Sequence, residues 1–495
     1  MKPISTVLGA LLLTLTACAG VDTRAAASAE PADVQARIDR VERGLSTPVT
    51  VKGVPPVSWS LRERMAFHHV PAVSIALVNH GKVEWVRAYG VLDAATARPA
   101  SPATLFQAGS VSKAVTAMGA LHLVEQHALS LDAPANDALR AWKIPDNTFT
   151  RTAPVTLRRL LNHSAGMTVH GFHGYAPGQA IPSLLQVLDG APPANSDPIR
   201  VDVTPGTRWR YSGGGFSVVQ LMMTEAGKAP FDPLMQRTVL GPLGMRDSTY
   251  ALTLPPARQE RAATGHRSDG SAVPGHWQIY PESAAAGLWT TAADLARIVI
   301  EVQQAQGGQS GKVLSSAMTA TLLTRGLGEY GLGFYVEPLG AGTSFSHSGG
   351  TDGFRAQLYG YSHTGQGVVV LTNSDNGAAL IAELLGSISA EYGWPEFGRI
   401  EKTALAPDAA LNAAAAGAYT LEDQPAAIIA EGDRLYFQSD LFGAQRMELF
   451  AESRTRFFMT AQDMSVVFKR GEDGRVDGFD LLRGANTYVG TRHRP

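Results

Sequence analysis

The stretch FQAGSVSK, residues 106–113, places Ser110 and Lys113 three residues apart at the start of a run that favours a helix. On a helix this spacing puts both side chains on one face, with Cβ atoms roughly 5–6 Å apart. A serine hydroxyl becomes a nucleophile when a neighbouring base takes its proton, and a lysine can be that base when burial disfavours its ammonium form. Two ordinary helix residues could share this spacing, so the interpretation depends on the rest of the chain.

The chain around this stretch predicts a rigid setting for Ser110. Apolar runs at 73–78 and 83–89 predict two strands, and the turn residues between them predict a hairpin. The helix that follows Ser110 is expected to run to about Gln126, with apolar residues along its buried side. Free backbone amides at the N-terminus of that helix would stabilise an oxyanion that forms beside Ser110.

Two later stretches place a polar ring beside glycines. PGTRWRYSGGG, residues 205–215, sets Tyr211 before three glycines, which allow the backbone to come close to a ligand or to another segment. FSHSGGTDGF, residues 345–354, sets His347 on a predicted strand that two further apolar strands follow. Tyr211 by itself is better explained as a core aromatic residue with a satisfied hydroxyl. A similar pattern at His363 falls in a hairpin turn, which indicates a solvated loop.

Between these stretches, the glycine-rich loop HGFHGY contains His170 and His173. A metal site is one interpretation of the pair, but no carboxylate or third histidine stands nearby at ligand spacing. A lining of a substrate cleft is therefore preferred, and neither a metal nor an organic cofactor is expected. The segment 177–205 is long, proline-rich and poorly periodic, which is typical of a lid or a pocket wall.

Composition indicates a globular protein of two or three domains. The chain has 495 residues, of which 44% are hydrophobic and 17% are charged. The formal net charge of −2 gives no polyelectrolyte signature, so a nucleic acid partner is not expected. Nothing in the sequence indicates an oligomeric state.

The N-terminus predicts export. A basic residue, Lys2, precedes an apolar run at 7–15 that is too short to span a bilayer comfortably. The run ends near Cys18, the only cysteine of the chain, in a pattern similar to the bacterial lipobox, whose cysteine is lipidated and becomes the mature N-terminus. We therefore expect a membrane contact through a lipid anchor at Cys18, on the periplasmic or cell-surface face. An ordinary signal peptide cleaved after Ala19, which would give a soluble secreted protein, is the alternative.

The C-terminal part predicts a separate all-β unit. Short strands recur from Gly417 onward, with turn residues between them. Segments such as GAYTL, RLYFQ and VVFKR resemble a small lipocalin-like β-domain. A packing or pocket-covering role is preferred for it over ligand binding.

Together, Ser110-Val-Ser-Lys113, Tyr211-Ser-Gly213 and His347-Ser-Gly349 resemble the three motifs of the serine β-lactamase and penicillin-binding-protein superfamily. The likeness is closer to class C β-lactamases, D-aminopeptidases, DD-peptidases and esterases of that fold. Further similar segments include VPAVSIALV, VTLRRLLNHSAGM and AAAGLWTTAADLA, so that the resemblance spans about residues 34–395. The chain lacks a G-x-S-x-G elbow, which argues against an α/β-hydrolase.

The resemblance implies an α+β fold, the β-lactamase/transpeptidase-like fold, with an antiparallel sheet flanked by helices and a helical lobe. It implies five units, which are a signal segment at 1–18, a tether at 19–33, the hydrolase domain at 34–398, a linker at 399–416 and the β-domain at 417–495.

The resemblance also implies roles for single residues. Ser110 is the nucleophile, Lys113 its proton partner, Tyr211 a general base or acid, and His347 a group that orients this relay or the substrate. The backbone amides of Ser110 and Gly350 form the oxyanion hole. Substrate contacts are expected from three further residues, Gly213, Ser348 and Gly349.

Two departures from the familiar pattern bear on the substrate. Many relatives have an asparagine where Gly213 stands, and many β-lactamases and DD-peptidases have a lysine where His347 stands. A histidine with an ordinary pKa is largely neutral at pH 7, so it offers no fixed charge to a substrate carboxylate. We therefore expect an exported serine hydrolase that cleaves a small-molecule or peptide ester or amide. A β-lactamase or DD-peptidase, and a non-catalytic acylated sensor, stand as alternatives.

Overall fold

The computed structural model describes residues 32–340, 342–422, 424–439, 446–484 and 486–493. The predicted signal segment, Cys18 and residues 19–31 of the predicted tether lie outside the described residues. Residues 32–33, which the sequence assigned to the tether, form the first turn of helix α1 (Ala32–Arg43).

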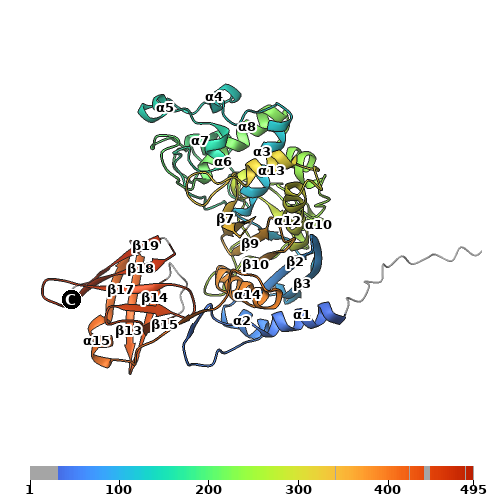
Figure 1. Ribbon diagram of the computed structural model, residues 1–495. Coiled ribbons are helices and arrows are strands. Elements are labelled where there is room, and N and C mark those ends of the chain that lie inside the picture. The colour runs from blue at the N-terminus through green and yellow to red at the C-terminus, as the bar shows by residue number, and fades with distance from the viewer. Residues whose placement is uncertain (1–31, 341, 423, 440–445, 485, 494–495) are drawn as a thin grey trace, which may run out of the picture.

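A seven-stranded antiparallel sheet forms the centre of the hydrolase domain (Figure 1). Its strand order is β4-β3-β2-β10-β9-β8-β7, so the first hairpin pairs directly with the strands near the end of the domain. The expected hairpin is confirmed, and its turn residues His80 and Gly81 both have positive φ, as a tight two-residue turn requires. The strand bounds are β2 Ala72–Asn79, β3 Lys82–Asp93, β4 Arg98–Pro99, β7 Tyr335–Leu339, β8 Gly342–Thr351, β9 Phe354–Tyr361 and β10 Gly367–Thr372.

The two faces of this sheet are covered by different helices. Along β2, Val73, Ile75 and Leu77 pack with α1 and with α14 (Gly377–Tyr392). The alternate residues Ala72, Ala76 and Val78 face the larger core that contains α12 (Ala292–Gln306). Because successive side chains of a strand point to opposite faces, one short apolar run contributes to both cores.

The larger core continues into a helical lobe (Figure 1). Its central helix is α3 (Val111–Glu125), whose residues are buried almost all round. Helix α3 contacts α8 (Gly213–Gly227) and α11 (Ser283–Ala286). The remaining helices are α2 Leu61–Phe67, α4 Ala135–Ala138, α5 Thr148–Thr152, α6 Leu157–Leu161, α7 Leu184–Asp189, α9 Phe231–Met235, the π-helical turn η1 Gln236–Leu240, α10 Pro256–Gln259 and α13 Ser316–Leu322.

Two small sheets complete the domain. Strand β5 (Phe106–Gln107) pairs with β6 (Trp289–Thr290) immediately before Ser110. Strand β1 (Val49–Val51) pairs in parallel with β11 (Ile400–Lys402). The predicted linker at 399–416 thus has secondary structure, because it contains β11 and helix α15 (Ala409–Ala415).

The C-terminal unit is a closed eight-stranded antiparallel barrel. Its interior is filled by aromatic and aliphatic side chains, among them Tyr419, Phe437, Phe457 and Phe479. This packed interior favours the accessory role over ligand binding inside the barrel. The strands are β12 Gly417–Leu421, β13 Gln424–Glu431, β14 Arg434–Ser439, β15 Met447–Ala451, β16 Arg456–Met459, β17 Ser465–Arg470, β18 Val476–Arg483 and β19 Asn486–Arg492.

The barrel lies beside α2 and α14, away from the helical lobe (Figure 1). Lys402 Nζ donates to Asp463 at 2.8 Å, and the amide of Val49 donates to the carbonyl of Thr460 at 3.4 Å. The α+β fold with an all-β C-terminal domain is therefore confirmed. Among the described residues, no helix has the length and apolar character that a membrane crossing needs.

Candidate active site

Ser110 is held between β5 and the N-terminus of α3. The preceding Gly109 has a φ of 51°, and a Cβ on it would lie 2.7 Å from the amide nitrogen of Gly350. The hydroxyl of Ser112 donates to the carbonyl of Gly109 at 2.6 Å and accepts from the amide of Leu288 at 3.0 Å. These contacts fix the turn that presents Ser110.

Lys113 lies one turn after Ser110 and is 2% exposed. Its Nζ donates to Ser110 Oγ at 3.0 Å and to the carbonyl of Ala285, in α11, at 2.9 Å. Burial lowers the pKa of Lys113 to about 7. A substantial fraction of this amine is therefore neutral at physiological pH and can accept a proton.

Tyr211 stands before α8 and approaches both residues. Its ring centroid is 4.9 Å from Lys113 Nζ. Burial raises the pKa of the Tyr211 phenol well above its ordinary value, and a hydrogen bond with the side chain of Ser110 only partly opposes this. The phenol therefore stays protonated at neutral pH.

The three glycines that follow Ser212 form the first turn of helix α8. The side chain of Ser212 caps α8 by accepting from the amide of Gly215 at 2.9 Å. A Cβ on Gly213 would lie 3.0 Å from the ring of Phe172, and one on Gly214 would lie 2.7 Å from the carbonyl of Thr168. The glycines thus allow close approach of the loop at 168–172, and the side of Gly213 that a side chain would occupy faces this loop.

His347 lies on β8 and is buried. Its Nδ1 is 2.6 Å from the carbonyl of Ser348, so Nδ1 carries the proton and donates. Its Nε2 then accepts from the hydroxyl of Tyr330 at 2.9 Å. Burial, with the charge of Lys113, lowers the pKa of His347 to about 3. The ring is therefore neutral at every physiological pH.

The backbone after His347 packs against the turn of Ser110. A Cβ on Gly349 would lie 1.9 Å from the carbonyl oxygen of Ala108 and 3.1 Å from the amide nitrogen of Ser110. Ser348 and Gly350 are exposed toward the cavity. Only glycine at 349 allows the amides of Ser110 and Gly350 to approach one another.

The expectation of free amides along the first turn of α3 is wrong. The amides of residues 111–113 donate to the carbonyls of residues 108–110, at 2.9–3.2 Å. These amides already have acceptors in the tight turn that precedes the helix. The amides of residues 111–113 are therefore not available to an oxyanion beside Ser110.

These residues surround a cavity of about 500 Å³, a size that suits a small substrate. The hydrolase domain supplies all of its lining within the part of the chain that the structure describes, and the loop at 177–205 supplies none. The lining is Ser110, His170, Trp209, Arg210, Tyr211, Tyr335, His347, Ser348, Gly349 and Gly350.

Of the two loop histidines, His170 lines this cavity, whereas His173 is exposed and does not line it. No group of three potential metal ligands occurs among the described residues. The segment at 177–205 contains α7, which packs against α8, instead of covering the cavity.

Sequence reasoning missed several aromatic residues of the site. Trp209 and Tyr335 form a wall with ring centroids 6.4 Å apart, and Tyr330 packs edge-on against Tyr335. His163 is buried, with its ring centroid 4.3 Å from that of Tyr211. Apart from the proximity of Trp209 to Tyr211 in the chain, only the fold brings these rings together.

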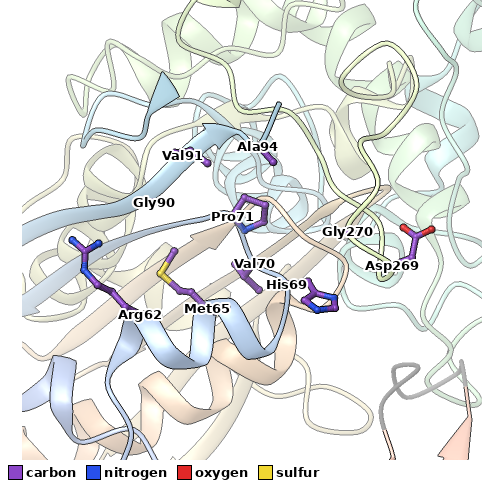
Figure 2. Close-up of a pocket in the computed structure, with 11 residues that line it drawn as sticks. Arg62, Met65, His69, Val70, Pro71, Gly90, Val91, Ala94, Asp269 and Gly270 are labelled. Carbon is purple, nitrogen blue, oxygen red and sulfur yellow. The ribbon is translucent and has the colours of Figure 1, made fainter. Parts of the chain in front are cut away.

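A second cavity, of about 530 Å³, lies between α2 and β3. Met65 and Val70 form its apolar floor, and Figure 2 shows Arg62 and Asp269 at opposite ends. Its lining includes no serine, threonine, cysteine or lysine, so it offers no counterpart to the Ser110–Lys113 pair.

Fold and geometry together define a serine hydrolase with a buried lysine beside its nucleophile. The sequence profile of the family described as Beta-lactamase matches residues 60–390, and the chain belongs to that family.

Known proteins similar to this chain have different activities by name. Penicillin-binding protein 4* of Bacillus subtilis (strain 168) is 24% identical over 442 residues, which cover 84% of this chain and 93% of that protein. Esterase EstB of Burkholderia gladioli is 28% identical over 359 residues, which cover 64% of this chain and 88% of that protein. The octameric penicillin-binding protein homologue from Pyrococcus abyssi shares the fold, with a TM-score of 0.58 and 20% identity over 87% of this chain and 98% of that chain.

Proposed function

We propose that this protein hydrolyses esters or amides without a recognition carboxylate, through an acyl-enzyme on Ser110. The observation that carries the proposal is the 3.0 Å contact of Lys113 Nζ with Ser110 Oγ, at a lysine whose pKa burial lowers to about 7. A neutral amine at that distance can take the serine proton as the oxygen attacks.

In the first step, Ser110 Oγ bonds to the substrate carbonyl carbon while its proton passes to Lys113. The negative charge on the carbonyl oxygen is stabilised by the amides of Ser110 and Gly350, an arrangement whose donors are each worth roughly 3–4 kcal/mol of barrier. Lys113 is favoured over Tyr211 as the base, because burial raises the pKa of the phenol and keeps it protonated.

In the second step, the bond to the leaving group breaks. The protonated Tyr211 hydroxyl donates to the departing oxygen or nitrogen, and the ammonium of Lys113, close to the same ring, restores the phenol proton. Water then attacks the acyl-enzyme in a reaction that reverses these proton transfers and releases the acid.

The cavity supports a neutral substrate. Where a lysine would provide a fixed charge, His347 is neutral and bonded to Tyr330. Arg210 also lines the cavity, but one nitrogen of its guanidinium donates to the carbonyls of Gly166 and Met167 and to Asp202, so its charge is already paired within the protein. The aromatic wall of Trp209 and Tyr335 favours an apolar acyl or leaving group.

The assignment is tested with Ser110→Ala. We expect turnover of p-nitrophenyl butyrate to fall more than about a thousandfold, because the nucleophile is removed. Detection of an acyl adduct by intact mass, mapped to Ser110 by peptide analysis, would be direct evidence for the acyl-enzyme. Undiminished hydrolysis in the variant would refute the proposal.

A β-lactamase or DD-peptidase activity is the second candidate, supported by the similarity to Penicillin-binding protein 4*. A penicillin and a D-alanyl peptide are therefore also incubated with the protein, and an acyl adduct on Ser110 is sought by intact mass. A stable penicillin adduct with no ester turnover would instead favour the acylated sensor, which keeps its acyl group.

Export and lipid anchoring are also proposed, on the sequence of residues 1–18 alone. A Cys18→Ser form should leave the membrane fraction, because it lacks the thiol that receives the lipid. If that form still fractionates with membranes, lipidation at Cys18 is not what holds the protein there.

A further inference from the structure

His163 is a buried titratable residue beside the site, and the proposed mechanism gives it no role. It is 2% exposed and lies outside the set of residues that line the cavity. Its ring packs against Tyr211, with centroids 4.3 Å apart and an angle of 37° between the planes. Its role is inferred on the basis of the proposed function, in which Tyr211 donates a proton.

The backbone at His163 follows a helix-ending turn. Helix α6 ends at Leu161, and the amides of His163 and Ser164 bond back to the carbonyls of Leu160 and Arg159. His163 therefore occupies the left-handed position of this turn, with a φ of 59°. Glycine is the usual residue there, because a Cβ strains that conformation. The turn itself would favour glycine, so a buried histidine at this position indicates a role beyond ending the helix.

His163 binds the backbone on both sides of Tyr211. Its carbonyl accepts from the amide of Arg210 at 2.8 Å, and its ring Nδ1 accepts from the amide of Ser212 at 3.2 Å. Three contacts from one residue thus fix the residue before the tyrosine, the residue after it and the phenol ring itself.

The contact with Ser212 fixes the protonation of the imidazole. Because Nδ1 accepts, the proton of the neutral ring lies on Nε2, which is buried without a hydrogen-bond partner among the described residues. Burial, and the charge of Lys113 after it, hold the pKa of His163 well below its ordinary range. The ring therefore keeps the Nδ1 lone pair that the Ser212 amide needs.

We propose that His163 is a positioning residue that holds the Tyr211 hydroxyl at Ser110 by anchoring both flanking amides and the phenol ring. It touches no reacting atom, so its effect on the rate passes through Tyr211. Misplacement of such a group by about 1 Å can cost roughly a hundredfold in rate.

The test is a double-mutant cycle with Tyr211→Phe. His163→Gly relaxes the turn and removes the ring, whereas His163→Asn tolerates the left-handed backbone and places an oxygen acceptor near the Nδ1 position. We expect His163→Gly to lower kcat on p-nitrophenyl butyrate by roughly tenfold to a hundredfold with little change in KM, and His163→Asn to restore part of it.

In the Tyr211→Phe background, neither change at position 163 should lower kcat more than about twofold, because the donor that they position is already gone. His266→Asn, at an equally buried histidine outside the cavity, is the matched control and should leave kcat unchanged. Thermal unfolding of each variant separates loss of fold from loss of positioning.

Additive losses in the two backgrounds, or a rise in KM with kcat unchanged, would overturn the inference. So would equal kcat values for the glycine and asparagine variants. The proposed function fails separately, if Ser110→Ala stays active. If His163→Gly does not fold, the double-mutant cycle with Tyr211→Phe is measured with His163→Asn instead. The asparagine side chain is shorter than histidine but keeps both the turn and the acceptor.

Discussion

Replacing Lys113 by methionine should stabilise the protein while abolishing its activity. Burial lowers the pKa of Lys113 from 10.5 to about 7. At about 1.4 kcal/mol for each pH unit, the charged form is disfavoured in the fold by roughly 5 kcal/mol. Methionine removes this cost but leaves the carbonyl of Ala285 and the hydroxyl of Ser110 without their donor, a loss of roughly 1–3 kcal/mol. We therefore expect Lys113→Met to gain roughly 2–4 kcal/mol at pH 7 or below.

The stability that Lys113→Met gains over the wild type depends on pH. Between pH 7 and 10.5 the unfolded chain keeps a proton on Lys113 that the folded chain has lost. Stability rises with pH wherever the unfolded state binds more protons, so the wild type recovers about 1.4 kcal/mol relative to the variant for each pH unit above 7. Below pH 7 both states are protonated, and the difference between the two proteins is constant.

The measurement is urea unfolding of both proteins from about pH 6 to 9, followed by tryptophan emission. All seven tryptophans lie before residue 399, so the signal reports the hydrolase domain and not the barrel. The exposed Lys312→Met is the matched control for replacing a lysine by methionine. The same ionisation predicts that kcat/KM of the wild type rises through a midpoint near pH 7. A stability difference that is flat from pH 6 to 9 would refute the lowered pKa.

Three further changes test other parts of the structure. Gly349→Ala should lower kcat roughly a hundredfold or more in steady-state kinetics, because its Cβ would collide with the carbonyl of Ala108 beside Ser110. The same collision should lower the thermal unfolding midpoint, since the buried backbone must shift to admit the methyl group. Glu383→Gln should cost roughly 3–5 kcal/mol in urea unfolding, since it breaks a buried pair with Arg64 at 2.6 Å. Burial raises the pKa of Glu383, but its hydrogen bonds to His68 and Arg64 outweigh this and hold that pKa below 4.5, so the wild-type advantage should shrink as pH falls through the acid range. Phe479→Ala should destabilise the barrel by roughly 3–5 kcal/mol without changing ester kcat, because the barrel supplies no cavity residue; a matching loss of activity would show that the barrel supports the site.

The parts of the site that the sequence predicts are those that local geometry determines. Ser110 and Lys113 meet because they stand one helical turn apart, and the three glycines after Tyr211 predict a close backbone approach. The fold class was implied by the family resemblance that the three short motifs carry. Each of these patterns lies within a few residues along the chain, where spacing and conformation are directly related.

What the sequence could not predict arises from contacts between distant segments. Tyr330 is 17 residues from His347 in the chain, yet its hydroxyl is the donor to Nε2 of His347. His163 is separated from Ser212 by 49 residues. The first turn of α3 was expected to offer free amides, but the tight turn at Gly109 already uses them.

The hydrogen bond between Tyr330 and His347 explains how the proposed chemistry can proceed without the fixed positive charge of a lysine at position 347. A lysine at 347 would place a second ammonium near Lys113, and repulsion between like charges would lower the pKa of Lys113 further unless a substrate carboxylate neutralised the pair. The neutral ring of His347, with both nitrogens hydrogen-bonded, removes that requirement. Burial alone then sets the pKa of Lys113, so the amine can serve as the proposed base before any substrate binds. A site arranged in this way gains nothing from an anionic substrate, which is the physical reason to expect neutral esters or amides in its cavity.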